Sequence, residues 1–299
     1  MAILLSNEII NAVLDELKSA EKSVQIITAY CKKKAFSKLD SVISGGVQNK
    51  RLLVRFRLDD VLKESTDFEI LEYGLQNGWD VFIRFDLHAK TYIVDNKRGL
   101  VGSANATNSG LNIGKSGNME MATFIDVEPE DVEKINGLFD DAIPVDSGLI
   151  EKMRQQLNLI EPSDKQKNYS WNNEITQRFN PCINTLFSYE LPEDFELVNG
   201  EYFSFLDYTY TGNLDDFKEV FRWSNAFLWL LKLVKDNNGE IYFGEATVAL
   251  HNALITDPKP YRRDVKQMLA NLLDLIQRLE MPEVTIDRPN HSQRIRLTL

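Results

Sequence analysis

The first half of the sequence alternates between helical and strand-like patterns, and this alternation limits the fold more than any other feature. Apolar residues recur at helical spacing over residues 7–18, and the apolar run at residues 24–30 is typical of a buried strand. The same patterns predict strands at residues 51–58, 79–85, 90–95, 99–103 and 121–127, and helices at residues 68–76 and 130–139. Such alternation is typical of α/β folds. We therefore expect an α/β sandwich domain over residues 1–145.

The second half of the chain has a different pattern. Residues 146–199 contain a helical stretch at 149–159 and a polar run at 161–168, so we interpret them as a connector with short helices. A mainly helical domain is expected over residues 200–299. Its predicted elements are an aromatic-rich strand region at 202–210, helices at 215–235, 243–255 and 261–279, and strands at 284–286 and 294–297. Three helices before a terminal hairpin favour a winged helix, but a dimerisation module would show the same pattern.

Charge is unevenly distributed along the chain. The formal net charge of −11 does not favour tight non-specific binding to phosphates. Residues 258–299 nevertheless contain eight Lys and Arg against five Asp and Glu. The candidate DNA-binding residues in this stretch are Arg262, Arg263, Lys266, Arg294 and Arg296. A solvated helix face with a charged tail would give the same count. A second group, Lys32–Lys34 with Lys38, could border a phosphate-binding cleft or be merely solvated.

Several classes of protein find no support in this sequence. No apolar run approaches the ~20 residues that a membrane span needs, and no signal-peptide pattern is seen, so we expect a cytoplasmic protein without a membrane partner. Cys31 and Cys182 have no nearby Cys, so we expect reduced thiols. We expect neither a metal nor a cofactor.

The most informative stretch spans residues 88–105 and has the form H-x-K-x4-D-x6-G-S-x-N. Its specified residues are His88, Lys90, Asp95, Gly102, Ser103 and Asn105. On a strand, His88 and Lys90 project from the same face, so an imidazole and an ammonium group can meet one anion. Asn105 can bring an amide donor to the same oxygens, since it follows a Gly-Ser turn. The pattern predicts a site that binds and attacks phosphate.

This stretch resembles the HKD motif of the phospholipase D superfamily, with the expected residue type at every specified position. The resemblance covers residues 1–145. It implies a metal-independent phosphodiesterase in which one histidine attacks phosphorus and forms a phosphohistidine. A second histidine would protonate the leaving oxygen and later activate water.

The resemblance also implies a role for each residue of the motif. His88 would be the nucleophile or its partner acid. Lys90 and Asn105 would hold the non-bridging oxygens of the pentacoordinate state, and Ser103 would add a hydroxyl donor. Asp95 would support the site without taking part in the chemistry.

The implied mechanism further needs a carboxylate that orients the histidine, and a second histidine. Glu120 stands at the expected distance after the motif to orient His88, although a surface Glu would look the same. No second motif exists, because neither His251 nor His291 is followed by Lys at the required position. Single-motif members of the superfamily form twofold dimers with a shared site, and twofold dimers are also the commonest oligomers. We therefore expect a homodimer.

Single-motif relatives include bacterial nucleases and restriction endonucleases that carry a DNA-reading domain after the catalytic domain, and the layout of this chain resembles theirs. We therefore predict a hydrolase of the endonuclease type, of the restriction or defence class, with residues 200–299 docked on duplex DNA. Two alternatives stay open. One is a phospholipid phosphodiesterase or phosphatidyltransferase, and the other is a DNA-binding regulatory protein that uses the phospholipase D-like domain as a dimerisation platform.

Overall fold

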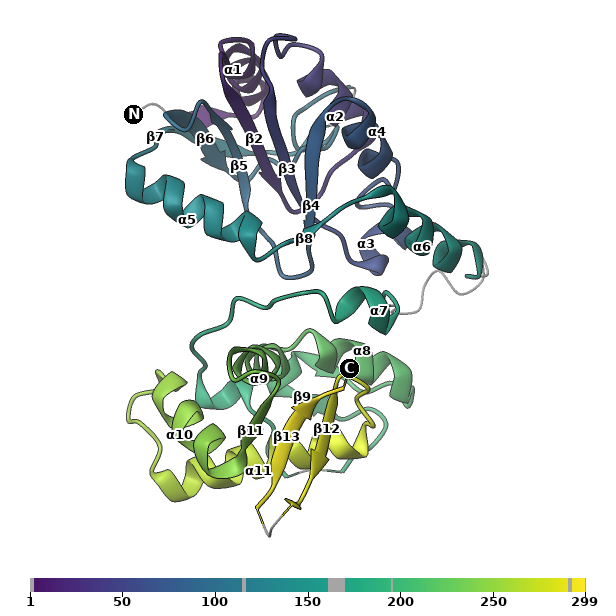
Figure 1. Cartoon of the computed structure of the whole chain (residues 1–299), viewed down its shortest axis with the longest axis vertical. Coiled ribbons are helices and arrows are strands. Elements are labelled where there is room, and N and C mark those ends of the chain that lie inside the picture. Colours follow the sequence, from purple (N-terminus) through teal and green to yellow (C-terminus); the bar gives the residue numbers. More distant parts are fainter. Residues whose placement is uncertain (1–2, 115–116, 161–169, 195, 290–291, 299) are drawn as a thin grey trace. The chain divides into compact units, whose positions relative to one another are not determined.

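The computed structural model describes residues 3–114, 117–160, 170–194, 196–289 and 292–298. The chain divides into two compact units (Figure 1). The first unit is Met1–Gln166 with Ser170–Phe179, and the second is Asn180–Leu299 with Lys167–Tyr169. The polar run predicted at 161–168 lies outside the described residues.

The first unit is built on one mixed sheet of eight strands. Its strands are β1 (Ile3–Leu5), β2 (Ser23–Thr28), β3 (Asn49–Arg55), β4 (Trp79–Arg84), β5 (Lys90–Val94), β6 (Arg98–Gly102), β7 (Met121–Asp126) and β8 (Ile143–Pro144). They lie in the order β1-β7-β6-β5-β2-β3-β4-β8, with β2, β3 and β4 parallel to one another and the other pairs antiparallel. The expected α/β fold is confirmed, and the short edge strands β1 and β8 were not predicted.

Helices cover both faces of this sheet (Figure 1). They are α1 (Asn7–Lys18), α2 (Lys33–Asp40), α3 (Leu58–Leu62), α4 (Ile70–Gln76), α5 (Pro129–Asp140), α6 (Ser147–Asn158) and α7 (Asn173–Thr176). On one face, Phe139 of α5 packs with Ile27, Leu53 and Ile93 of the central strands. On the other face, α2 contacts both α1 and α4. Side chains alternate between these two layers along each strand, and β2 is buried almost throughout, as is the second half of β3 from Leu52 to Val54.

The first unit continues beyond the predicted end of the α/β domain. Residues 170–179, which we call the strap, pack on this unit. The indole ring of Trp171 stacks on Phe56, with ring centroids 6.1 Å apart, and its N–H donates to the Phe56 carbonyl oxygen at 2.7 Å. Phe179 packs on Phe85 with centroids 5.2 Å apart. The burial of these aromatic rings ties the strap to the first unit, so only the chain from Asn180 onward is separate from it.

The second unit is mainly helical, as predicted. Its helices are α8 (Leu214–Arg222), α9 (Asn225–Asp236), α10 (Phe243–Ala253) and α11 (Arg262–Arg278), with 3-10 turns η2 (Ser188–Glu190) and η3 (Ser204–Leu206). Its strands are β9 (Tyr202–Phe203), β10 (Tyr208–Thr209), β11 (Glu240–Tyr242), β12 (Val284–Asp287) and β13 (Arg294–Leu297). The last three form an antiparallel sheet in the order β11-β13-β12. From α9 onward, the chain order and the strand pairing are those of a winged helix, with α11 in the place of the recognition helix.

The long helix predicted at residues 215–235 is in fact two helices. The Ser224 hydroxyl accepts a hydrogen bond from the Phe227 N–H at 3.3 Å, which caps the start of α9. Such a cap begins a new helix rather than continuing the old one. The break lets Phe221 of α8 and Phe227 of α9 pack on each other in the core, with centroids 5.1 Å apart.

Candidate active site

His88 and Lys90 lie at one end of β5, in the middle of the sheet between β6 and β2. His88 precedes the strand and is exposed, whereas Lys90, its first residue, is partly buried. The Lys90 ammonium donates a hydrogen bond to the backbone oxygen of His88 at 2.8 Å. The structure therefore places the first two residues of the motif side by side.

Two arginines that the sequence analysis did not single out lie close to this pair. Arg55 ends β3, and its guanidinium donates two hydrogen bonds to Asp60 at 2.8 and 2.9 Å and one to the Tyr30 hydroxyl at 2.6 Å. Arg57 donates to the Phe85 carbonyl oxygen at 2.5 Å. The signal was present in the sequence, because both arginines follow a strand at the carboxyl edge of a parallel segment, where ligands of α/β proteins bind.

The positive charges around His88 change its protonation. Burial, together with the charges of Lys90, Arg55 and Arg57, lowers the pKa of His88 from its ordinary value of 6.5. Burial and the charge of Arg55 also lower the pKa of Lys90, against the opposing effect of Glu120. A lowered pKa favours the neutral imidazole at neutral pH, which is the form with a lone pair available for attack.

Asn105 is linked to these residues through Tyr30. Its Oδ1 atom accepts hydrogen bonds from the Tyr30 backbone N–H at 3.0 Å and from the Thr28 hydroxyl at 3.3 Å. Its Nδ2 donor has no protein partner among the described residues. Gly110 makes room for this turn, since a Cβ there would lie 2.6 Å from the Asn105 carbonyl oxygen. The amide is thus held with its donor end available to a ligand. We refer to the residues Arg55, Arg57, His88, Lys90 and Asn105 as the His88 cluster.

Glu120 lies beside the His88 cluster but does not hold His88. Its buried carboxylate accepts a hydrogen bond from the Ser103 hydroxyl on one oxygen and from Asn118 Nδ2 at 3.1 Å on the other. In the part of the chain that the structure describes, no hydrogen bond joins Glu120 to His88. The expected orienting contact is therefore not present within one chain. Glu120 precedes β7, which β6 separates from β5, so the carboxylate meets the end of β6 instead.

Asp95, which the resemblance assigns a supporting role, lies at the end of β5 opposite to His88 and Lys90. It follows the opposite end of β5, in the turn to β6, where its backbone has a φ of 55°. Its carboxylate accepts hydrogen bonds from the backbone N–H groups of Glu21, Lys22 and Ser23 at 2.7–3.1 Å. Asp95 therefore joins the β5–β6 turn to the start of β2.

The candidate DNA-binding residues of the second unit fall into two groups. Arg262, Arg263 and Lys266 are exposed at the start of α11, and the Arg263 side chain is 95% exposed with only a 3.6 Å contact to Asp264. Arg294 and Arg296 behave differently. Arg294 donates twice to Asp287 at 2.8 and 3.0 Å and once to Glu240, and Arg296 lies 3.6 Å from Asp287. Acidic neighbours thus compensate the strand arginines, while the helix presents its charge to solvent.

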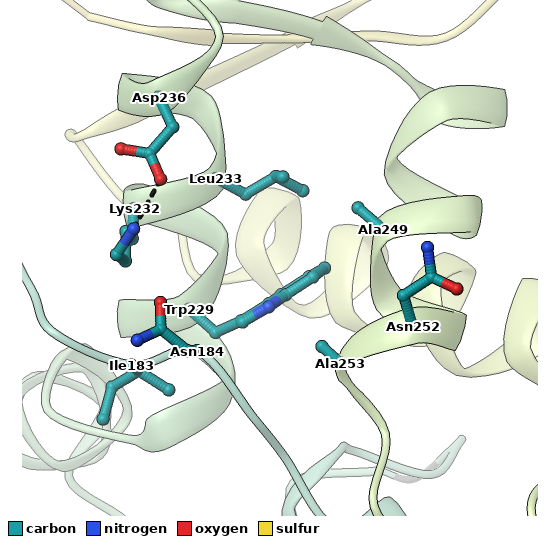
Figure 2. Close-up of a pocket in the computed structure, with 9 residues that line it drawn as sticks. All are labelled: Ile183, Asn184, Trp229, Lys232, Leu233, Asp236, Ala249, Asn252 and Ala253. Carbon is teal, nitrogen blue, oxygen red and sulfur yellow. Dashed lines mark hydrogen bonds and ion pairs between the residues drawn. The ribbon is translucent and has the colours of Figure 1, made fainter.

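A cavity of about 290 Å³ lies in the second unit, between α9 and α10. Figure 2 shows Trp229 and Leu233 of α9 reaching toward Ala249 and Ala253 of α10. An ion pair between Lys232 and Asp236 lies at its edge, with an N–O distance of 2.5 Å. No residue of the motif lines this cavity, so it is separate from the His88 cluster.

Within the described ranges, no group of three or more His, Cys, Asp or Glu side chains is arranged to hold a metal ion. The described helices include none that is both long and apolar enough to cross a bilayer.

Comparison with known proteins agrees with the motif. Residues 13–143 match the family described as cardiolipin synthase, PLD-like domain. A comparison with curated proteins found no match. Similar solved structures include Nuc from Salmonella typhimurium, a phospholipase D family member, at 19% identity and a TM-score of 0.38, covering 49% of this chain and 99% of that one.

Two further solved structures are similar to this chain. NucT from Helicobacter pylori is 15% identical, with a TM-score of 0.37 over 48% of this chain and 98% of that one. Phosphatidylserine synthase from Haemophilus influenzae is 16% identical, with a TM-score of 0.41 over 53% and 44%. The family match covers the strands and turns that carry the His88 cluster. Residues 13–143 are thus a phospholipase D-like domain.

Proposed function

We propose that this chain is a phosphodiesterase that hydrolyses nucleic-acid phosphodiesters, with DNA as the main substrate, through a phosphohistidine and without a metal ion. The observation that carries the proposal is the His88 cluster. It combines an imidazole of lowered pKa, three cationic side chains and an amide donor. A phosphodiester carries one negative charge and two non-bridging oxygens, and this set of donors matches it.

The reaction has two steps that use two histidines. In the first, the neutral imidazole of His88 attacks phosphorus, and an N–P bond forms while the bond to the leaving oxygen breaks. A protonated second histidine gives its proton to that oxygen. In the second step, the same histidine takes a proton from water, the water oxygen attacks phosphorus, and the N–P bond breaks to release a phosphomonoester. Lys90 and Asn105 hold the non-bridging oxygens in both steps.

The second histidine comes from a second copy of the chain. An exposed apolar patch supports this view, made of Ile3, Leu5, Val101, Met119 and Met121. Ile3 of β1 and Val101 of β6 are both paired with Thr123 of β7, so their side chains point from the same face of the sheet. Exposed apolar patches of this kind mark interaction surfaces.

The position of the patch favours a shared active site. Met119 and Met121, which are 85% and 55% exposed, flank Glu120 in sequence, and Glu120 accepts a hydrogen bond from Ser103 of the motif. A twofold contact through this patch would bring the two motifs toward each other, because the same surface meets itself across such an axis. One site per dimer, with one His88 from each chain, is the arrangement that we propose.

The second unit supplies the contact to DNA in this proposal. The exposed cations at the start of α11 stand where a recognition helix meets the groove of a duplex. Compensated arginines such as Arg294 contribute little to phosphate binding, because their charge is already neutralised. We assign docking on duplex DNA to α11, and a role in restriction or defence fits a catalytic domain joined to such a module.

A substrate panel tests the proposed function. Purified protein is incubated with plasmid DNA, single-stranded DNA, RNA and phosphatidylcholine vesicles, each with and without EDTA. We expect cleavage of nucleic acid that is unchanged by EDTA. Turnover of phosphatidylcholine alone would favour the lipid phosphodiesterase. Binding of duplex without turnover of any substrate would favour the regulatory protein, and activity that EDTA abolishes and magnesium restores would contradict the mechanism.

A further inference from the structure

A polar pocket of about 610 Å³ opens in the first unit, and we call it the amide pocket. Three asparagines line it, together with hydroxyl side chains and two lysines. The residues that carry the argument are Lys32, Lys34, Asn105, Asn108 and Asn118. A volume of this size is within the range of pockets that hold small organic ligands. Its lining is rich in amides and hydroxyls, which favours a ligand with many hydrogen-bonding groups over an apolar one.

The amide pocket is continuous with the His88 cluster. Asn105 belongs to both, and its amide is fixed by the Tyr30 backbone N–H. Asn118 also lines the pocket and donates to Glu120, which adjoins Ser103 of the motif. A ligand in the pocket would therefore lie next to a phosphate bound at the His88 cluster.

One buried atom of the pocket lining has no partner. Asn108 lines the pocket, and its Oδ1 atom is buried without a hydrogen-bond donor in the described structure. A buried acceptor without a partner is costly, by roughly 1–3 kcal/mol, and such atoms are rare in folded proteins. The N–H groups of a nucleobase are donors that this oxygen can accept from.

One cation of the amide pocket can meet a phosphate. Lys34, in the first turn of α2, is exposed and has no ion pair among the described residues, whereas Lys32 pairs with Asp67 at 2.7 Å. Glu64 also lines the pocket, and its negative charge partly opposes the attraction of a phosphate by Lys34. Lys38, which the sequence placed in the same group of lysines, does not line it.

We propose that the amide pocket receives one unpaired nucleotide adjacent to the scissile phosphate. The inference rests on the proposed function and specifies its substrate. The base would meet the asparagine amides, and Lys34 would meet the neighbouring phosphate. A base in this pocket cannot stay stacked in a duplex, and unstacking costs a few kcal/mol unless the base is already unpaired. The substrate is then a strand with an unpaired nucleotide, such as a bulge, flap or single strand.

The test separates binding in the pocket from chemistry. The full-length His88→Ala protein is titrated with fluorescent DNA duplexes that carry a one-nucleotide bulge, either with its base or as an abasic site. We expect the abasic probe to bind about 10-fold more weakly, since stacking and base contacts are worth roughly 1–3 kcal/mol. Equal affinities for the two probes would overturn the inference. The same probes made with RNA distinguish the two kinds of nucleotide.

Three further substitutions, each made in the His88→Ala protein, test whether the preference for the base arises in the amide pocket. Asn108→Leu removes the buried acceptor, so we expect it to abolish the preference for the base while the melting temperature stays the same or rises. Lys34→Glu is a surface change that we expect to weaken binding of both probes at least 5-fold. Lys38→Glu, on the same helix but outside the pocket, is the matched control and should change neither. An Asn108→Leu protein that keeps the preference contradicts the inference.

Failure of the proposed function gives a different result. Bis(4-nitrophenyl) phosphate is a small diester that does not need the amide pocket. Its hydrolysis by otherwise wild-type protein shows an intact catalytic centre, and Lys38→Glu, outside the pocket, should leave that hydrolysis unchanged. If wild-type protein hydrolyses no diester, the proposed function fails, while the binding titration still decides whether the pocket holds a nucleotide.

Discussion

The two units both present positive charge, but they hold it in different ways. In the first unit, neighbouring groups fix the guanidinium of Arg55 through three hydrogen bonds, and its charge converges with that of Lys90 on His88. In the second unit, Arg263 at the start of α11 is almost fully exposed. Fixed charge stabilises a transition state, since no reorganisation is needed at the moment of reaction, whereas exposed charge attracts a polyanion without fixing its position. The difference suggests chemistry in one unit and docking in the other.

The largest expected effect comes from His88→Ala. We expect the rate of diester cleavage to fall by about 100-fold or more, because covalent and acid–base roles are usually worth at least that much. Duplex binding through α11 should be unchanged. Steady-state cleavage and a binding titration measure the two effects. Retention of more than about a hundredth of the wild-type rate would remove His88 from the mechanism.

A mixed dimer sharpens the claim about the first unit. A heterodimer of wild-type and His88→Ala chains has one of the two histidines of a shared site, so we expect it to be nearly inactive. Two independent sites would instead give about half of the wild-type activity. The heterodimer is obtained by co-refolding chains with two different tags and purifying on both. A fully active monomer in solution would rule out the shared site.

Charge reversal tests the second unit. Replacing Arg262, Arg263 and Lys266 by Glu should weaken duplex binding about 10-fold or more at moderate salt and flatten its salt dependence. The matched control replaces Arg296 by Gln, which should change binding less than 3-fold because Asp287 already faces that arginine. A fragment of residues 180–299 that folds but binds no nucleic acid would instead indicate a dimerisation or protein-partner domain.

A smaller effect concerns the pH dependence of cleavage. The pKa of His88 is lowered by burial and by the neighbouring cations, so the reactive neutral form persists to lower pH than for an ordinary histidine. The acidic limb of the kcat/KM profile should have its midpoint below pH 6.5. Lys90→Gln removes one of these charges, so the midpoint of its residual activity should shift upward. A midpoint above 6.5 in the wild-type protein would contradict the assignment.

The smallest effect is expected at Asp95. Burial acts in the opposite direction, but the backbone N–H groups of Ser23, Lys22 and Glu21 lower the pKa of this carboxyl. The ionised Asp95 carboxylate therefore stabilises the fold fully above pH 3.8, the ordinary pKa of the group. This stabilisation is lost as the pH falls through the lowered pKa of the folded protein. Asp95→Ala should reduce the free energy of unfolding by about 1 kcal/mol, because the carboxylate is partly solvated. Cleavage per folded molecule should stay within about 2-fold, and a large loss would return Asp95 to the site.

The sequence predicted the parts of the site that are close together along the chain. His88 and Lys90 are two residues apart at the start of β5, so their spacing alone placed them side by side. Arg55 and Arg57 were missed although they stand at the carboxyl end of a predicted strand, because their approach to His88 depends on the order of the strands in the sheet. The same holds for Glu120, whose position in the sheet directs it to Ser103 rather than to His88.

The fold was predictable to a similar degree. Helices and strands with clear periodicity lie where they were expected, such as α1 and β4. The three-residue strands β1 and β11 are too short to give a periodic signal, although β11 completes the sheet of the winged helix. The strap was interpreted as connector because its sequence is polar apart from a few aromatic residues, and those are the residues that bury it.

The strap also determines how short the catalytic part of the chain can be. Trp171 binds the carbonyl of Phe56, the residue between the two arginines, and Phe179 packs on Phe85, whose carbonyl holds Arg57. A chain cut at residue 145 would keep the entire motif but lose both of these supports. A domain swap or gene fusion that keeps only the motif would therefore retain His88 but lose the contacts that support the loop with Arg55 and Arg57. A fragment that keeps the first unit whole therefore ends at Phe179.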